Sequence, residues 1–209
     1  MRLVAARKHG VKAPATESLV AGANWESKSI SGEQHTRVEF VALDLTEAKN
    51  VGSVFAECTF RNCKFNVSSH KDAAFINCTF KSCSFFDTKF YECKFVGSMF
   101  DRCTYDLMEV LGGNWSHVGL PGANLNKATF SHVRLREADL TGARAEGGSI
   151  RDCDMSGAWL HNANLTDCDL RGSDLSAIDP ESTQYRGAVI TMNQAITIAT
   201  ALGLDVRAE

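Results

Sequence analysis

A large apolar side chain recurs at every fifth residue over most of the chain, from Phe40 to Ile190. Only Asn50, His70 and Pro180 interrupt this column. A period of five fits neither an α-helix, which repeats every 3.6 residues, nor a strand, which alternates every two. The chain must therefore turn after each short extended piece, and this excludes most folds open to 209 residues.

A second column, two residues before each large side chain, holds small residues and all eight cysteines. Positions two apart share one face of a strand, so each unit sends one small and one large residue inward. Cysteines stacked in parallel do not reach the dihedral angle of a disulfide. They also lack the CxxC-like spacing of a zinc site. We therefore expect buried free thiols, no bound metal and no cofactor.

Glycine marks the corners of the predicted coil. Eleven of the sixteen glycines lie two residues after a position of the five-residue column. That is the place in a type II turn where the backbone φ is positive. Four such corners close a square turn of 20 residues, and successive turns stack about 4.8 Å apart. The pattern predicts an all-β fold, a quadrilateral parallel β-helix.

The two ends of the chain depart from the repeat. We expect a flexible basic tail over 1–22, the β-helix over 23–190, and a C-terminal helix with a dimerisation segment over 191–209. Thr191 and Gln194 form a capping-box pattern, and Gly203 suits a helix C-terminus. This α-helix would cap the open end of the solenoid.

Three positions inside the repeat predict local irregularities. Asn50 and His70 are 20 residues apart, so segments 46–54 and 66–74 are the expected places for the backbone to bulge outward. His70 is therefore a candidate partner contact. The glycine pair in 111–113 predicts a further bulge.

Charge and motifs exclude several function classes. With 22 basic and 25 acidic residues the net charge is −3, which is too acidic for direct nucleic acid binding through a basic surface. No apolar run is long enough to span a membrane, and no secretion signal is present, so we predict a cytoplasmic protein. The sequence contains no GxxxxGK[ST], HExxH or GxSxG motif and predicts no enzyme.

Negative charge concentrates between Glu137 and Glu181. This stretch holds ten acidic residues against three arginines, a net of −7. It would occupy roughly 11 Å of rod, over which duplex DNA carries about six charges. Two interpretations follow from charge alone: mimicry of DNA, or simple solvation of the rod. The acidic residues are Glu137, Asp139, Glu146, Asp152, Asp154, Asp167, Asp169, Asp174, Asp179 and Glu181.

One aromatic residue lies in the acidic stretch at an outward position. Trp159 falls between the coil levels of Asp139 and Asp179. A large aromatic ring is costly to leave in water, so Trp159 is a second candidate partner contact.

Several segments carry a family resemblance. Ala123-Asn124-Leu125, Ala138-Asp139-Leu140 and Ala163-Asn164-Leu165 fit the loose unit A(D/N)LXX, and the chain thereby resembles the pentapeptide repeat proteins. That resemblance implies a right-handed quadrilateral β-helix. The segments 69–80, 110–114 and 187–204 are similar to the branch of mycobacterial fluoroquinolone-resistance and, more distantly, Qnr-type gyrase-protecting proteins.

The resemblance implies a function as well as a fold. It implies a rod-shaped homodimer in which an acidic stretch binds DNA gyrase, or a related type II topoisomerase, in place of DNA. Such binding confers resistance to fluoroquinolones, or self-resistance to natural gyrase poisons. A scaffolding solenoid with another protein partner is the alternative, and a thiol redox or metal protein is a third. The residues implied at the dimer interface are Ile196, Ile198, Leu202, Leu204 and Val206.

Overall fold

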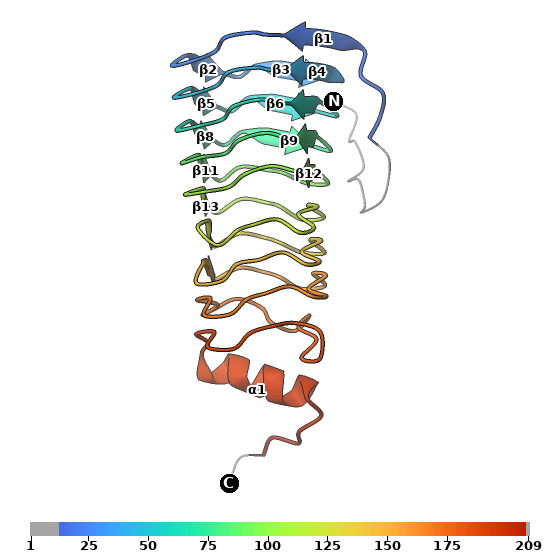
Figure 1. Ribbon diagram of the computed structural model, residues 1–209, viewed down its shortest axis with the longest axis vertical. Coiled ribbons are helices and arrows are strands. Elements are labelled where there is room, and N and C mark those ends of the chain that lie inside the picture. Colours follow the sequence, from blue (N-terminus) through green and yellow to red (C-terminus); the bar gives the residue numbers. More distant parts are fainter. Residues whose placement is uncertain (1–12, 208–209) are drawn as a thin grey trace.

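Residues 20 apart in the sequence lie side by side in successive turns of a coil. The computed structural model describes residues 13–207, and in it the chain winds into a long stack of turns closed by one helix (Figure 1). Ser18 pairs with Val38, and every later strand pair keeps the same offset of 20 residues. The predicted square turn of 20 residues is confirmed.

Three of the four walls carry short parallel strands. The first wall contains β1 (Ser18–Ala21), β4 (Val38–Val41), β7 (Thr59–Arg61), β10 (Thr79–Lys81) and β12 (Met99–Asp101). The second contains β2 (Ser29–Ser31), β5 (Lys49–Val51), β8 (Ser69–Lys71), β11 (Lys89–Tyr91), β13 (Glu109–Leu111), β14 (Thr129–Ser131) and β15 (Ser149–Arg151). The third contains β3 (Gln34–Thr36), β6 (Val54–Ala56) and β9 (Ala74–Ile76). Isolated parallel bridges form the fourth wall and extend the others toward the C-terminus.

The corners have the predicted left-handed backbone. Gly122 has a φ of 64°, and its coil position matches the glycine of a type II turn. The same conformation occurs without glycine, as at Glu47 with a φ of 59°. There the Ala48 N–H donates to the Leu45 carbonyl at 3.0 Å and closes the turn. Glycine is thus favoured at the corners but is not required by the coil.

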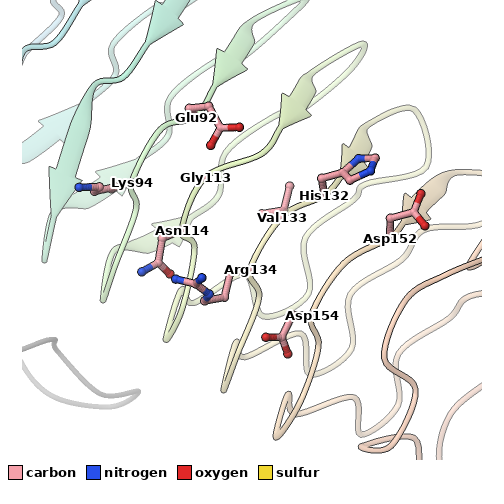
Figure 2. Close-up of a pocket in the computed structure, with 9 residues that line it drawn as sticks. All are labelled: Glu92, Lys94, Gly113, Asn114, His132, Val133, Arg134, Asp152 and Asp154. Atoms are coloured by element: carbon pink, nitrogen blue, oxygen red, sulfur yellow. The ribbon is translucent and has the colours of Figure 1, made fainter.

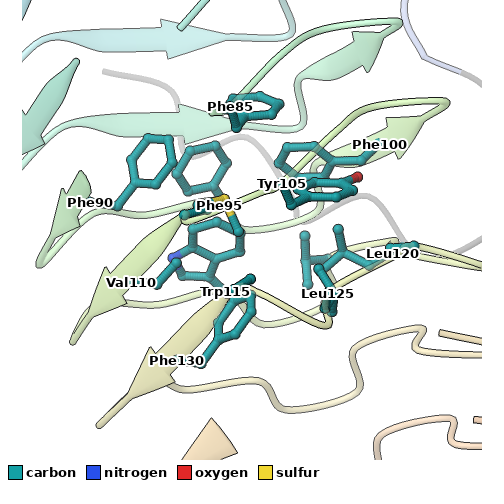
Figure 3. Packing of buried hydrophobic residues seen from close by; sticks show 14 of the residues in the cluster. Phe85, Phe90, Phe95, Phe100, Tyr105, Val110, Trp115, Leu120, Leu125 and Phe130 are labelled. Atoms are coloured by element: carbon teal, nitrogen blue, oxygen red, sulfur yellow. The ribbon is translucent and has the colours of Figure 1, made fainter. Parts of the chain in front are cut away.

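Stacked rings fill the first half of the coil. Phe60 lies parallel to Phe40 and Phe80, with ring centroids 5.0 and 4.9 Å apart. Trp115 packs against Phe95 at 4.2 Å, where the phenylalanine stacks give way to leucine (Figure 3). The column read from the five-residue period is therefore the core.

The cysteines occupy the inner column, as predicted. Seven of the eight are buried, and Cys103 is half-buried. All eight are free thiols. Burial raises the pKa of Cys93 and of Cys168 to about 12, so these thiols stay protonated and unreactive.

The cysteines in the first half of the coil share one hydrogen bond to the preceding turn. The Cys63 thiol donates to the Phe40 carbonyl oxygen at 3.4 Å, and five other cysteines reach the residue 23 positions earlier in the same way. Within the described residues the Phe40 carbonyl receives no N–H from its own turn. In other turns the N–H closes the turn, as where Ala128 donates to the Leu125 carbonyl at 3.0 Å.

The predicted bulges at 46–54 and 66–74 are wrong. β5 and β8 pair in register, and Asn50 and His70 point into the core. The Asn50 Nδ2 lies 3.1 Å from His70 Nδ1, and Ser68 Oγ lies 2.9 Å from His70 Nε2. Both ring nitrogens of His70 and the Asn50 Nδ2 thus have partners inside the coil, while Asn50 Oδ1 is buried without one in the described chain.

The predicted bulge within 111–113 is wrong as well. Asn114 pairs with Lys94 in the turn before and with Arg134 in the turn after, so no residue is inserted. Gly113 has a φ of +92°, and a Cβ there would lie 2.1 Å from the Cys93 carbonyl oxygen. The glycine instead lets the backbone approach the preceding turn closely.

The solenoid begins earlier than expected. β1 pairs with β4, and Glu17 donates its N–H to the Arg37 carbonyl at 2.7 Å. The predicted flexible tail over 1–22 is therefore wrong for 17–21, while residues 1–12 lie outside the described residues. Val20 and Trp25 continue the five-residue column only weakly. A turn nevertheless forms there, because β1 can pair with the edge of β4.

The C-terminal helix closes the other end of the stack. α1 (Met192–Ala201) begins after Thr191, whose side chain accepts from the Gln194 N–H. The Gln194 side chain accepts in return from the Thr191 N–H at 2.7 Å, which confirms the predicted capping box. The buried Gln194 amide also donates to the Leu170 and Ser173 carbonyls at 2.7 Å. In the described chain no helix has the length and apolar character needed to cross a bilayer.

Candidate functional site

The predicted acidic residues are distributed around the rod. Their coil positions divide them into three groups around it, because residues lie above one another only when their numbers differ by about 20. Asp139 is 2% exposed, so its assignment to the acidic surface is wrong. Its Oδ1 accepts from the Thr141 N–H at 3.0 Å and stabilises a turn.

Arginine side chains neutralise two of the predicted carboxylates. Asp154 forms an ion pair with Arg136. Asp169 pairs with Arg171 at 2.7 Å and with Arg151 at 3.7 Å. Hydrogen bonds from Arg171 are the main cause that lowers the pKa of Asp169 to about 2. Arg151 and Arg171 are already among the three arginines counted in the stretch, whereas Arg136 lies one residue before it, so including Arg136 changes the net charge from −7 to −6.

The remaining carboxylates keep their negative charge exposed or half-exposed. Their described contacts include no ion pair with lysine or arginine, although Glu146 accepts from Asn126 at 2.8 Å. Among the described residues Glu137 pairs only with His117, at 3.4 Å. The other six are Glu146, Asp152, Asp167, Asp174, Asp179 and Glu181.

One part of this acidic region surrounds an exposed aromatic ring. Trp159 is 54% exposed, and its backbone pairs with Asp139 on the extension of the first wall. Asp179 and Glu181 occupy the next turn of that wall, and Glu137 lies at the preceding corner. We call Glu137, Trp159, Asp179 and Glu181 the Trp159 surface. The outward position predicted for Trp159 is confirmed.

His70 cannot contact a partner in this fold. It is fully buried and stacks on Phe90 with ring centroids 5.0 Å apart. Desolvation lowers the pKa of His70 to about 3, so the ring stays neutral in the folded protein. The candidate contact at His70 is therefore wrong, because the position faces the core.

Apolar side chains are exposed on and after α1. Met192 is 87% exposed, and it was missed because the sequence reading began the interface at Ile196. Ile198 instead packs partly against the core of the last turn. The exposed set is Met192, Ile196, Leu202, Leu204 and Val206.

A shallow hollow interrupts the edge between the second and third walls. It has a volume of about 420 Å³ and lies across successive turns at the glycine pair Gly112 and Gly113 (Figure 2). The glycine pair marked this place in the sequence, but a bulge was predicted there and not a hollow. Its lining residues are Glu92, Lys94, Gly113, Asn114, His132, Val133, Arg134, Asp152 and Asp154.

The described residues offer no metal centre. Among 13–207, no group of three or more histidine, cysteine or acidic side chains is arranged to hold a metal ion. The exposed charges lie along the walls and edges of the rod.

Family profiles match most of the coil. The family described as pentapeptide repeat region matches residues 53–130. The family described as pentapeptide repeats (8 copies) matches 120–157 and 149–179. No curated protein matches the chain.

Solved structures of pentapeptide repeat proteins share the fold. Full-length QnrB1, a plasmid-mediated fluoroquinolone resistance protein, matches with a TM-score of 0.54 at 19% identity, covering 90% of this chain and 99% of its own. A trypsin-treated QnrB1 variant gives 0.51 at 23%, covering 92% and 99%. HetL, which is involved in heterocyst differentiation regulation in the cyanobacterium Nostoc, gives 0.49 at 17%, covering 81% and 85%. The chain therefore belongs to the pentapeptide repeat family and resembles the Qnr proteins in fold.

Proposed function

We propose that the protein is a DNA mimic that binds DNA gyrase, or a related type II topoisomerase, and confers resistance to fluoroquinolones or natural gyrase poisons. One observation carries the proposal: six carboxylates in the last turns have no cationic partner among the described side chains. Such a surface attracts the basic groove that an enzyme uses for DNA. Because gyrase acts on chromosomal DNA, we place the protein in the cytoplasm.

The distribution of charge along several edges suits this role. The two backbones of duplex DNA wind around the axis and present phosphates on every side, so a mimic needs charge on more than one wall. The Trp159 surface adds an exposed ring that can pack against the partner, and aromatic residues are enriched at interfaces. The shared fold of QnrB1, a fluoroquinolone resistance protein, is consistent with the proposal.

We also propose a homodimer formed through the C-terminal ends. Exposed apolar side chains on and beyond α1 would be covered by their symmetry mates, since a twofold interface pairs one patch with itself. Replacing Leu202 and Leu204 by Glu should convert the dimer to a monomer in sedimentation. A wild-type protein that sediments as a monomer at all micromolar concentrations would contradict this part of the proposal.

A supercoiling assay with purified gyrase, with and without a fluoroquinolone, tests the binding role. The variant Glu137→Lys, Asp179→Lys, Glu181→Lys reverses the carboxylates beside Trp159 without breaking a described arginine pair. It should abolish both gyrase binding and protection, and salt should weaken the wild-type effect.

A matched control reverses Glu26 and Asp72, exposed carboxylates of the first turns. It should behave as wild type. If wild type does not affect gyrase, the proposal fails and scaffolding for another protein becomes the better function. If both variants act alike, the acidic end of the rod is not the contact.

A further inference from the structure

Three hydrogen-bond donors stack along the floor of the hollow at Gly112 and Gly113. Lys94, Asn114 and Arg134 occupy the same place in successive turns, with Asp154 in the turn after Arg134, and their backbones pair in that order. Figure 2 shows all three side chains along one side of the hollow. The spacing of turns sets these side chains about 4.8 Å apart.

The orientation of the middle donor is fixed. Asn114 Oδ1 accepts from the Ser116 N–H at 3.0 Å and from the Ser116 hydroxyl at 2.7 Å. With its oxygen held in this turn, Asn114 turns its Nδ2 away from Ser116. In the part of the chain that the structure describes, no acceptor contacts Asn114 Nδ2, Lys94 Nζ or the Arg134 guanidinium. Lys94, Asn114 and Arg134 are therefore three stacked donors without an acceptor among the described residues.

Carboxylates around the hollow limit the charge of what can enter. Glu92 and Asp152 line it without a lysine or arginine pair in the described chain, and Asp154 is paired with Arg136. A phosphate group, with a charge of about −1.5 to −2, meets more repulsion here than a singly charged carboxylate does. A carboxylate can accept from both Asn114 and Arg134.

We propose that this hollow binds a carboxylate carried by an acidic side chain of a protein partner. A protein segment fits better than a free metabolite, because the hollow is shallow and open along the edge of the rod. Small molecules need sites that bury most of their surface. This inference does not depend on the gyrase proposal: the donors lie on a different edge from the Trp159 surface, although Asp152 lines the hollow and is also one of the six unpaired carboxylates.

The test is an NMR titration of the Arg134 Nε–H signal with a defined probe. N-acetylglutamate amide is the monoanion, N-acetylglutamine amide is its neutral counterpart, and inorganic phosphate at pH 8 is the more highly charged anion. We expect at least about fivefold tighter binding of the glutamate probe than of either other probe, because an Arg–carboxylate contact is charge-assisted. Arg134→Gln, read at the Asn114 side-chain signal, should lower that affinity by at least about fivefold.

The chain contains a matched control. Arg144 is also exposed, and an asparagine, Asn124, occupies the same place in the preceding turn. Asn124 Oδ1 accepts from the Asn126 N–H at 3.3 Å. This Asn–Arg pair lies outside the hollow, so Arg144→Gln should leave binding unchanged.

Three results would overturn the proposal. The first is equal shifts at Arg134 and Arg144, which would mean nonspecific ion pairing. The second is preference for phosphate, and the third is no saturation by the glutamate probe. Lys94→Gln provides a second variant in case Arg134→Gln perturbs the fold.

Discussion

The buried pair of Asn50 and His70 should make the stability of the coil depend on pH. Folding desolvates the His70 ring and lowers its pKa from 6.5 to about 3. The unfolded chain therefore binds a proton that the folded chain excludes between these values. The free energy of unfolding is therefore unaffected by His70 above pH 6.5, and it decreases as the pH falls from 6.5 toward 3.

The size of the effect follows from the width of that window. Each pH unit is worth about 1.4 kcal/mol, so the free energy of unfolding should fall by about 2 kcal/mol between pH 7.5 and pH 5. The double variant Asn50→Leu, His70→Phe removes the titrating ring and continues the apolar wall between Ile30 and Phe90. Over the same range it should lose about 2 kcal/mol less of its free energy of unfolding than the wild type.

Urea unfolding of both proteins at pH 7.5, 6 and 5 measures the difference. The pKa of His35 is also lowered by burial, but His35 is present in both proteins and cancels in the comparison. The carboxylates with lowered pKa, such as Asp169, titrate below this range. Equal losses in the two proteins would refute the reasoning, since they would show that His70 is protonated without cost.

Three further changes test how the coil is held together. Cys63→Ala should lower the free energy of unfolding by about 1 kcal/mol more than Cys63→Ser, because serine can still donate to the Phe40 carbonyl; urea unfolding compares them. Gly113→Ala should cost at least about 2 kcal/mol by the same measure, against about 1 for Gly122→Ala, which meets no atom within 4 Å. Gln194→Ala removes two buried hydrogen bonds and should speed amide exchange in α1; unchanged exchange would show that the helix is held by apolar contacts alone.

The repeat predicted the core well because its period is a geometric constraint. A position such as Phe60 or Cys63 must face inward once the turn has 20 residues, whatever lies around it. The capping box at Thr191 was predictable for a similar reason, since it depends only on local spacing. These features are fixed by backbone geometry within a few residues.

The errors concern side chains whose partners lie a whole turn away. His70 breaks the apolar column, yet Asn50 and Ser68 satisfy it inside the core. Asp139 belongs to a repeat unit that predicts exposure, but the residues around it cover its carboxylate. Ion pairs between neighbouring turns, such as Arg136 with Asp154, were likewise invisible to a count of charges along the chain.

The unbroken offset of 20 residues has a consequence for how such a rod can change. Removing or adding five residues between two corners would leave every inward position inward, because the column has the same step. All that follows would nevertheless rotate by a quarter of a revolution about the long axis. The direction in which Trp159 faces, relative to the hollow near Gly113, could thus change in steps of 90° about the long axis without altering the core.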